Sequence, residues 1–204
     1  MKAITMFLCL SVFLMNSVYA QKREEKIDPL KQNILSSLRT KNTFVSDQYS
    51  YALVPSLKAI SRNASYDLGY QLNHEQGTLM TPYGTQEVVE KKGKFLILNM
   101  PVKSFSQLSD LEQSETAPVM LNIQTKQYGI LTDHFLIKLK SMDEATQISS
   151  EYNLNILRTL PRLNLVVLQT ENAGQVLNMF NSLKKDERIL RVNLDIIENI
   201  NVPL

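Results

Sequence analysis

The sequence contains one cysteine, Cys9, and no tryptophan. Cys9 lies in an apolar N-terminal run that we interpret as a signal peptide, so the mature chain is expected to have no thiol. Such a chain cannot form a disulfide and cannot use a cysteine nucleophile. The stability of an exported protein of this composition must therefore come from a packed hydrophobic core.

An excess of charge of one sign is also missing. The chain carries 22 Lys and Arg residues against 20 Asp and Glu residues, a formal net charge of +2. Binding to nucleic acid or to an anionic membrane surface calls for a clustered basic patch, and none is visible in the sequence. We therefore predict neither nucleic acid nor a membrane as a partner of the mature protein.

Residues that carry catalysis are scarce. His74 and His134 are the only histidines, and neither stands in a spacing typical of metal ligands. No Gly-x-Ser-x-Gly nucleophile motif and no glycine-rich phosphate loop is present. Asp133 and His134 are adjacent, but they fall on a predicted strand, and we interpret His134 as a surface residue. The sequence predicts no catalytic residue, no metal and no cofactor, and hence no enzyme.

Residues 1–20 have the features of a secretory signal peptide. Lys2 supplies a positive charge, the following run to Met15 is mostly apolar, and Val18 and Ala20 place small side chains before a cleavage site. The apolar run is shorter than the roughly 20 residues that span a bilayer. We therefore expect an exported protein, periplasmic or secreted, that is free of the membrane once the signal peptide is removed.

The next two segments differ in their hydrophobic pattern. Residues 21–43 form a charged arm in which Asp28 and Pro29 can begin a short amphipathic helix. Residues 44–116 show alternation of apolar and polar positions, for example at 49–53 and 66–70, which is typical of half-buried strands. We predict a short N-terminal helix followed by a small, mainly β domain.

Residues 117–195 predict a lead-in hairpin and then the order strand, helix, strand, strand, helix, strand. Ser141 can cap the first helix, Asn153 can end it, and residues 163–169 are nearly all apolar, as in a central strand. The predicted fold class is therefore α+β, with a C-terminal ferredoxin-like βαββαβ module of the propeptide type preceded by the small β domain and the N-terminal helix. Such a module leaves one sheet face without helices. The upstream domain could cover this face, or it could be a docking surface.

Within this region, residues Thr132 to Asp195 resemble the propeptide, or inhibitor, domain of subtilisin-like serine proteases. The pieces that carry the resemblance are the strand at 135–140, the helix end at 151–154, the turn at 158–163, the apolar run at 165–168 and the segment at 186–195.

The resemblance implies a partner and a set of contact residues. In that family the sheet face packs on the protease and the C-terminal tail lies in the active-site cleft. Asp195 matches an acid that caps helices of the protease, whereas Asn193 stands where the family has a second acid. The tail, residues 196–204, would bind as an added strand, with side chains reaching pockets of the cleft. Its predicted contact residues are Ile196, Ile197, Ile200, Asn201, Val202, Pro203 and Leu204.

The sequence thus predicts an exported, stand-alone propeptide-like protein. It would bind a subtilisin-like serine protease in trans, as an inhibitor, a folding chaperone or both, because the chain ends about where a protease domain would begin. One alternative is a non-catalytic structural or binding protein of the envelope or the secreted fraction. Another is the product of a truncated protease gene.

Overall fold

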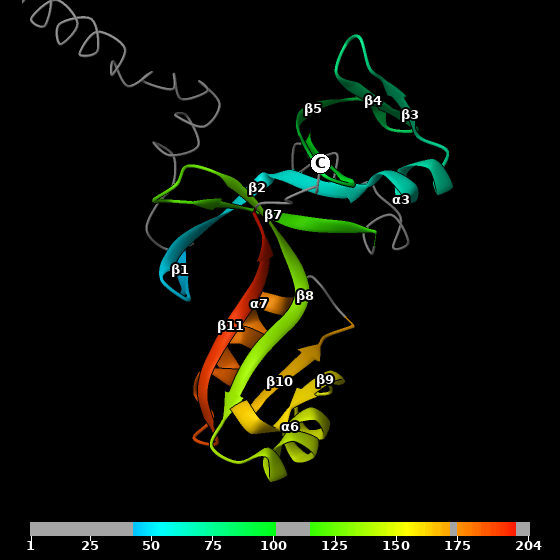
Figure 1. Ribbon diagram of the computed structural model, residues 1–204. Helices are drawn as coiled ribbons and strands as arrows, with labels where there is room; N and C mark the ends of the chain where they lie inside the picture. Colours follow the sequence, from blue (N-terminus) through cyan, green and yellow to red (C-terminus); the bar gives the residue numbers. More distant parts are fainter. Residues whose placement is uncertain (1–42, 101–114, 172–174, 199–204) are drawn as a thin grey trace, which may run out of the picture. The chain divides into compact units, whose positions relative to one another are not determined.

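The computed structural model describes residues 43–100, 115–171 and 175–198 (Figure 1). The predicted signal peptide and N-terminal helix lie outside these residues. All of these described residues fall in one compact unit. The described residues contain three α-helices and two 3-10 turns. These are α3 (Arg62–Asp67), η2 (Met142–Glu144), α6 (Ala145–Glu151), η3 (Pro161–Leu163) and α7 (Val176–Leu183).

In the part of the chain that the structure describes, eleven strands form a single sheet in which every pair is antiparallel. They are β1 (Thr43–Ser46), β2 (Tyr49–Ser61), β3 (Gln71–Asn73), β4 (Thr78–Thr81), β5 (Gly84–Lys92), β6 (Phe95–Asn99), β7 (Thr116–Asn122), β8 (Tyr128–Leu139), β9 (Asn155–Leu160), β10 (Leu165–Gln169) and β11 (Ile189–Ile197). Along the sheet the order is β3-β4-β5-β6-β2-β7-β8-β10-β9. In addition, β1 pairs with β2 and β11 pairs with β8.

The predicted fold class, a ferredoxin-like module behind a separate β domain, is wrong, because the sheet is continuous from one region to the other. Strand β8 is 12 residues long and changes partner along its length. Residues 128–130 pair with β7, and residues 134–138 pair with β10. Strand β2, with 13 residues, likewise pairs with β1, β6 and β7. The alternation of side chains along a strand is the same whichever partner it has, so the sequence pattern could not show that the partner changes.

One predicted strand is a helix. The alternation of Tyr66, Leu68 and Tyr70 predicted a strand, but Arg62–Asp67 is helix α3. The Ser61 hydroxyl accepts a hydrogen bond from the backbone amide of Ala64 at 3.0 Å and thereby caps this helix. A local cap of this kind outweighs a weak strand pattern over five residues.

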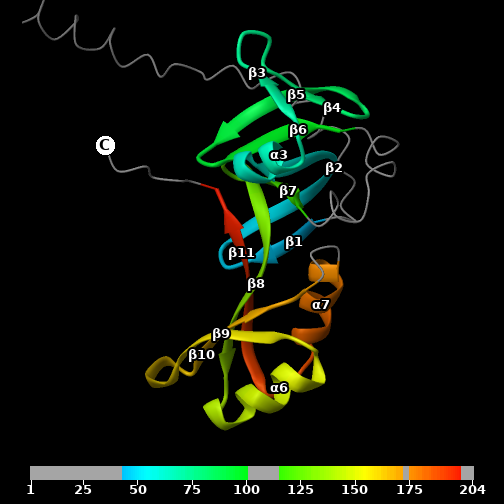
Figure 2. The same cartoon turned by 90° about the vertical axis from the view of Figure 1, so that its right-hand side faces the viewer.

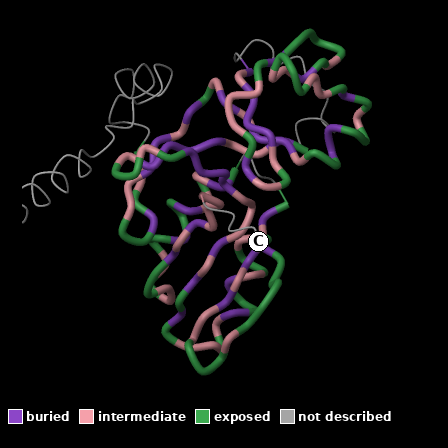
Figure 3. Tube along the Cα trace, turned by 45° about the horizontal axis from the view of Figure 1, so that its top comes forward, coloured by how far each residue is buried: buried purple, intermediate pink, exposed green. Residues whose placement is uncertain are grey.

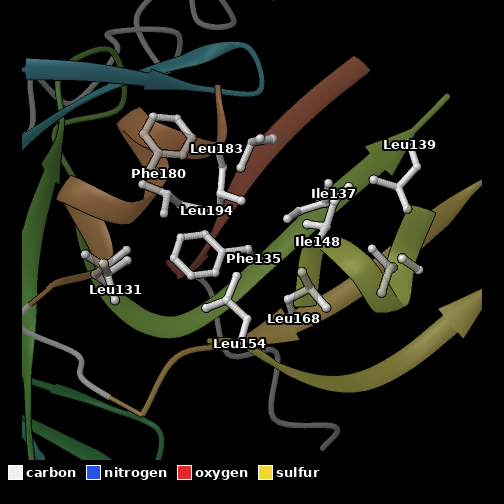
Figure 4. Close-up of a cluster of buried hydrophobic side chains, with 14 of the residues drawn as sticks. Leu131, Phe135, Ile137, Leu139, Ile148, Leu154, Leu168, Phe180, Leu183 and Leu194 are labelled. Atoms are coloured by element: carbon white, nitrogen blue, oxygen red, sulfur yellow. The ribbon is translucent and has the colours of Figure 1, made fainter. Parts of the chain in front are cut away.

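The sheet carries two hydrophobic clusters of buried side chains, and burial follows the strands while loop tips are exposed (Figure 3). The larger cluster joins β8, β10 and β11 to the helices α6 and α7. Phe135, Ile137 and Leu168 are fully buried there, and Phe180 of α7 and Ile148 of α6 pack against them (Figure 4). Both helices lie on the same side of strands β8 to β11, whose opposite face they leave uncovered (Figure 2). No helix in the described residues is long and apolar enough to cross a membrane.

A cluster of charged and hydrogen-bonded side chains joins the end of α6 to the loop before β11. The Asp186 carboxylate accepts hydrogen bonds from the backbone amide and the side chain of Arg188 at 2.6 to 2.9 Å, and from the Tyr152 hydroxyl at 3.2 Å. Arg188 also pairs with Glu151 of α6 at 2.5 Å. The Arg188 guanidinium beside Asp186 lowers the pKa of that carboxyl from its ordinary value of 3.8 to about 2. The charged carboxylate therefore stabilises the folded state.

We expect Asp186→Asn to lower the free energy of unfolding at pH 7 by about 2 kcal/mol, which is the free energy that corresponds to this pKa shift. A depressed pKa stabilises the fold above the unfolded value and loses that effect as the pH falls. The difference between wild type and variant should therefore shrink from pH 4 to pH 2. Urea unfolding over this pH range measures it, with the exposed neighbour Glu187→Gln as control. A difference that stays constant down to pH 2 would refute the assignment.

Candidate functional site

A hollow lies between the β1–β2 turn and strand β11. We call it the hairpin hollow. It has a volume of about 590 Å³ and is lined by Ser46 of β1 and Asp47 of the turn, by Tyr49 and Tyr51 of β2, by Leu136 of β8, and by residues 191 and 193–198. It therefore combines two tyrosine rings with charged and amide side chains, a mixture suited to a polar ligand with apolar parts.

Two side chains, those of Ser46 and Asp47, connect the turn to β11. The buried Ser46 hydroxyl accepts a hydrogen bond from the backbone amide of Leu194 at 2.9 Å, and it also donates to the carbonyl oxygen of the same residue at 3.4 Å. Asp47 adopts a left-handed conformation at the tip of the turn, and its carboxylate pairs with Arg191 at 3.8 Å. The Ser46 hydroxyl thus fixes the distance between the turn and β11 on one side of the hairpin hollow.

Four of the predicted protease-binding residues line this hollow: Asn193, Asp195, Ile196 and Ile197. The predicted boundary between strand and tail lies before Ile196, yet β11 continues to Ile197, with Ile196 opposite Leu131. These isoleucines are therefore strand residues held in the sheet. The remaining predicted tail residues, Ile200, Asn201, Val202, Pro203 and Leu204, lie outside the described residues.

Asp195 belongs to a local polar cluster. Its carboxylate accepts a hydrogen bond from the Thr132 hydroxyl at 3.1 Å and lies 3.4 Å from Nδ1 of His134. The other ring nitrogen of His134 lies 3.2 Å from Asp133, which in turn accepts a hydrogen bond from Gln169 at 2.8 Å. The histidine thus bridges two carboxylates and contacts no nucleophilic hydroxyl through its ring. Among the described residues no group of His, Cys, Asp and Glu side chains could hold a metal ion.

The segment after β11 is held by a second polar cluster. The Glu198 side chain accepts a hydrogen bond from Asn122 at 2.9 Å, and its carbonyl oxygen accepts one from the Lys92 ammonium at 2.5 Å. Burial raises the pKa of the Tyr51 hydroxyl, and the hydrogen bond and negative charge of Glu198 raise it further. Gly129 leaves the room for this arrangement, since a Cβ there would lie 2.5 Å from a methyl carbon of Ile196.

Beside the hairpin hollow lies the sheet face that the helices leave uncovered. We call it the open face. Strand register places its eight side chains in two rows across β9, β10, β8 and β11. One row is Leu160, Leu165, Lys138 and Arg191, and the other is Arg158, Val167, Leu136 and Asn193. These two rows thus carry four apolar side chains and three cations and no acid, and the nearest acid of β11 is Asp195, which lies beside His134 of the next row.

The charges of the open face are not balanced within it. Lys138 and Arg191 are direct partners across β8 and β11, and like charges in opposite positions destabilise a sheet. Asp195, which follows on β11, is already engaged with Thr132 and His134. Asp47 of the β1–β2 turn already pairs with Arg191 at 3.8 Å, and a carboxylate supplied by another molecule next to Lys138 would relieve the rest of this repulsion.

Several residues of these sites could not be expected from the sequence. Ser46 contacts a residue 148 positions away, and Lys92 contacts one 106 positions away. Only Asp47 leaves a trace in the sequence, since aspartate is common in turns and tolerates a left-handed conformation. The cations of the open face could be found only once the strand register was known.

Comparison with known proteins identifies a family. The family described as "Open reading frame 2 N-terminal domain" matches residues 14–203. The chain belongs to this family. No curated protein and no solved structure matches the chain.

The resemblance to subtilisin propeptides is therefore wrong, because the family that covers almost the whole chain is a different one. It depended on apolar patterning over Thr132–Asp195, and alternating strands with amphipathic helices produce similar patterns in unrelated folds. The protease partner stays a prediction.

Proposed function

We propose that this member of the family is an exported, non-catalytic protein that binds another protein on its open face. The observation that carries the proposal is the pair of cross-strand rows, in which apolar side chains lie beside cations and no helix covers them. Exposed sheet faces with this mixture are suited to a partner that supplies apolar contacts and complementary charge. The signal-peptide pattern of residues 1–20 supports export.

The charges indicate what the partner presents. Lys138, Arg158 and Arg191 lie on three different strands, so a complementary partner needs carboxylates spread over a surface rather than one acidic side chain. Leu136 and Val167 lie side by side in the middle of the second row and would be covered by apolar contacts. We infer an acidic protein surface with an apolar centre.

Site-specific photocrosslinking tests the location. A photoreactive phenylalanine derivative is placed at Val167 on the open face, or at Asn178, an exposed residue on the helix side. Each protein is mixed with the secreted and periplasmic fractions of the source. We expect one major adduct from Val167 that is missing from Asn178 and that weakens as salt is raised. The same adducts from both positions, or none from Val167, would contradict the proposal.

A further inference from the structure

The outer edge of β11 is a second surface with the properties of a binding site. Among the described residues β11 pairs only with β8, so its other edge has no strand partner. Both backbone groups of Leu194 point away from β8, because they bond to the Ser46 hydroxyl. The register with β8 is regular from Arg191 to Leu194. The amide and carbonyl of Val192 therefore point to the same outer edge.

Hollows lie on both faces of this edge. The hairpin hollow includes Leu136 of the open face. A smaller one, which we call the edge hollow, has a volume of about 260 Å³ and includes Lys184, which follows α7, so it lies on the helix side. Asp47, Arg191 and Asn193 line both. The β1–β2 turn occupies this edge at Leu194 through the Ser46 hydroxyl. An extended strand sends successive side chains to opposite faces, so a strand added beside Val192 would point one side chain to the edge hollow and the next toward the hairpin hollow.

The edge hollow combines exposed apolar side chains with cations. Val45 is 55% exposed and Leu190 is 57% exposed, which places two of the most exposed large apolar side chains of the described residues at this one hollow. Lys184 and Arg191 supply two positive charges. Asp47 is the only acidic residue in the lining, and it already pairs with Arg191 at 3.8 Å. The hollow thus suits an apolar side chain that has a carboxylate next to it.

We propose that the outer edge of β11 accepts an extended peptide segment of a partner protein as an added strand. The segment places an apolar side chain in the edge hollow, and a neighbouring carboxylate meets Lys184. Hydrogen bonds to the Val192 backbone hold the segment, and the two hollows select its side chains. A second copy of the chain is a poor occupant, because its own Lys184 and Arg191 would face the same cations.

This inference rests on the proposed function only in assuming that the protein binds other proteins. Its site is a different one, because Val45, Lys184 and Val192 do not belong to the open face. The probe is a displayed library of random eight-residue peptides selected on the full chain. We expect enriched peptides that alternate apolar and polar positions and carry an acidic residue. An enriched peptide should slow hydrogen exchange at the Val192 amide at least about tenfold, because that amide gains a partner.

Two variants and a control separate the surfaces. Val45→Asp and Lys184→Glu should each weaken binding of an enriched peptide at least about tenfold, a loss of about 1.4 kcal/mol. Lys138→Glu with Arg158→Glu, on the open face, should leave it unchanged. Selection that enriches nothing above a chain-free control would overturn the inference. So would peptides that leave Val192 exchange unaffected, or peptides whose binding is lost only with the open-face variant.

Discussion

Replacing Phe180 with alanine is expected to lower the free energy of unfolding by about 3–5 kcal/mol, the usual cost of truncating a buried phenylalanine. Phe180 is 1% exposed and packs edge-on against Phe44 of β1, with ring centroids 6.1 Å apart. It therefore joins α7 to the β1–β2 hairpin as well as to the sheet. Helix α7 has only 8 residues and no side-chain cap, so packing rather than local structure must hold it in place.

Chemical unfolding of the variant and of Leu163→Ala measures this effect. Leu163 is 61% exposed, so its truncation should change the free energy of unfolding by no more than about 0.5 kcal/mol. A loss below about 1 kcal/mol for Phe180→Ala would show that α7 does not pack on the sheet as described, since a filled core site cannot be emptied at so small a cost.

Replacing Lys92 with methionine is expected to lower the free energy of unfolding by about 3 kcal/mol, because hydrogen bonds from a charged donor contribute more than neutral ones. The Lys92 side chain is 9% exposed. Its ammonium donates to the carbonyl oxygens of Tyr128 and Glu198 and pairs with Glu90 at 3.3 Å. Methionine keeps the apolar stem and removes the three polar contacts.

The matched control is Lys94→Met on the same hairpin, since Lys94 is exposed and its ammonium lies 5.4 Å from the centroid of the Phe95 ring. Lys94→Met should lower the free energy of unfolding by no more than about 1 kcal/mol. Lys92→Met should also speed amide exchange at Ile196 and Ile197, because Glu198 loses its anchor. Stability equal to wild type would refute the role of Lys92, since an apolar side chain would then serve as well in this position.

Local signals in the sequence predicted much of the secondary structure. Ser141 does cap the turn that leads into α6, with its hydroxyl accepting a hydrogen bond from the Asp143 amide at 3.3 Å. Asn153 does adopt the left-handed conformation expected after that helix. The alternation at 49–53 is confirmed as part of β2. Each of these features depends on residues a few positions apart, which is the range that capping and periodicity rules cover.

The arrangement of the strands could not be predicted in the same way. Strands β2 and β8 exchange partners along their length, and nothing in their alternation marks where β7 gives way to β10. The sequence therefore suggested a boundary where the sheet is continuous. Four of the predicted contact residues line the hairpin hollow. Asp47 and Tyr49 of the same hollow come from a hairpin more than 140 positions away.

The central claim is that the open face binds a protein partner. It is tested most directly by measuring how tightly the partner that crosslinks to position 167 binds to variants in which charges of the open face are reversed. Purified partner is titrated against wild type, against Lys138→Glu with Arg158→Glu, and against Lys91→Glu with Lys94→Glu, a control with the same change in net charge on β5 and the turn that follows it. We predict that the open-face variant binds at least about tenfold more weakly, while the control binds like wild type. Equal affinity for all three proteins would contradict the assignment of the open face as the binding surface.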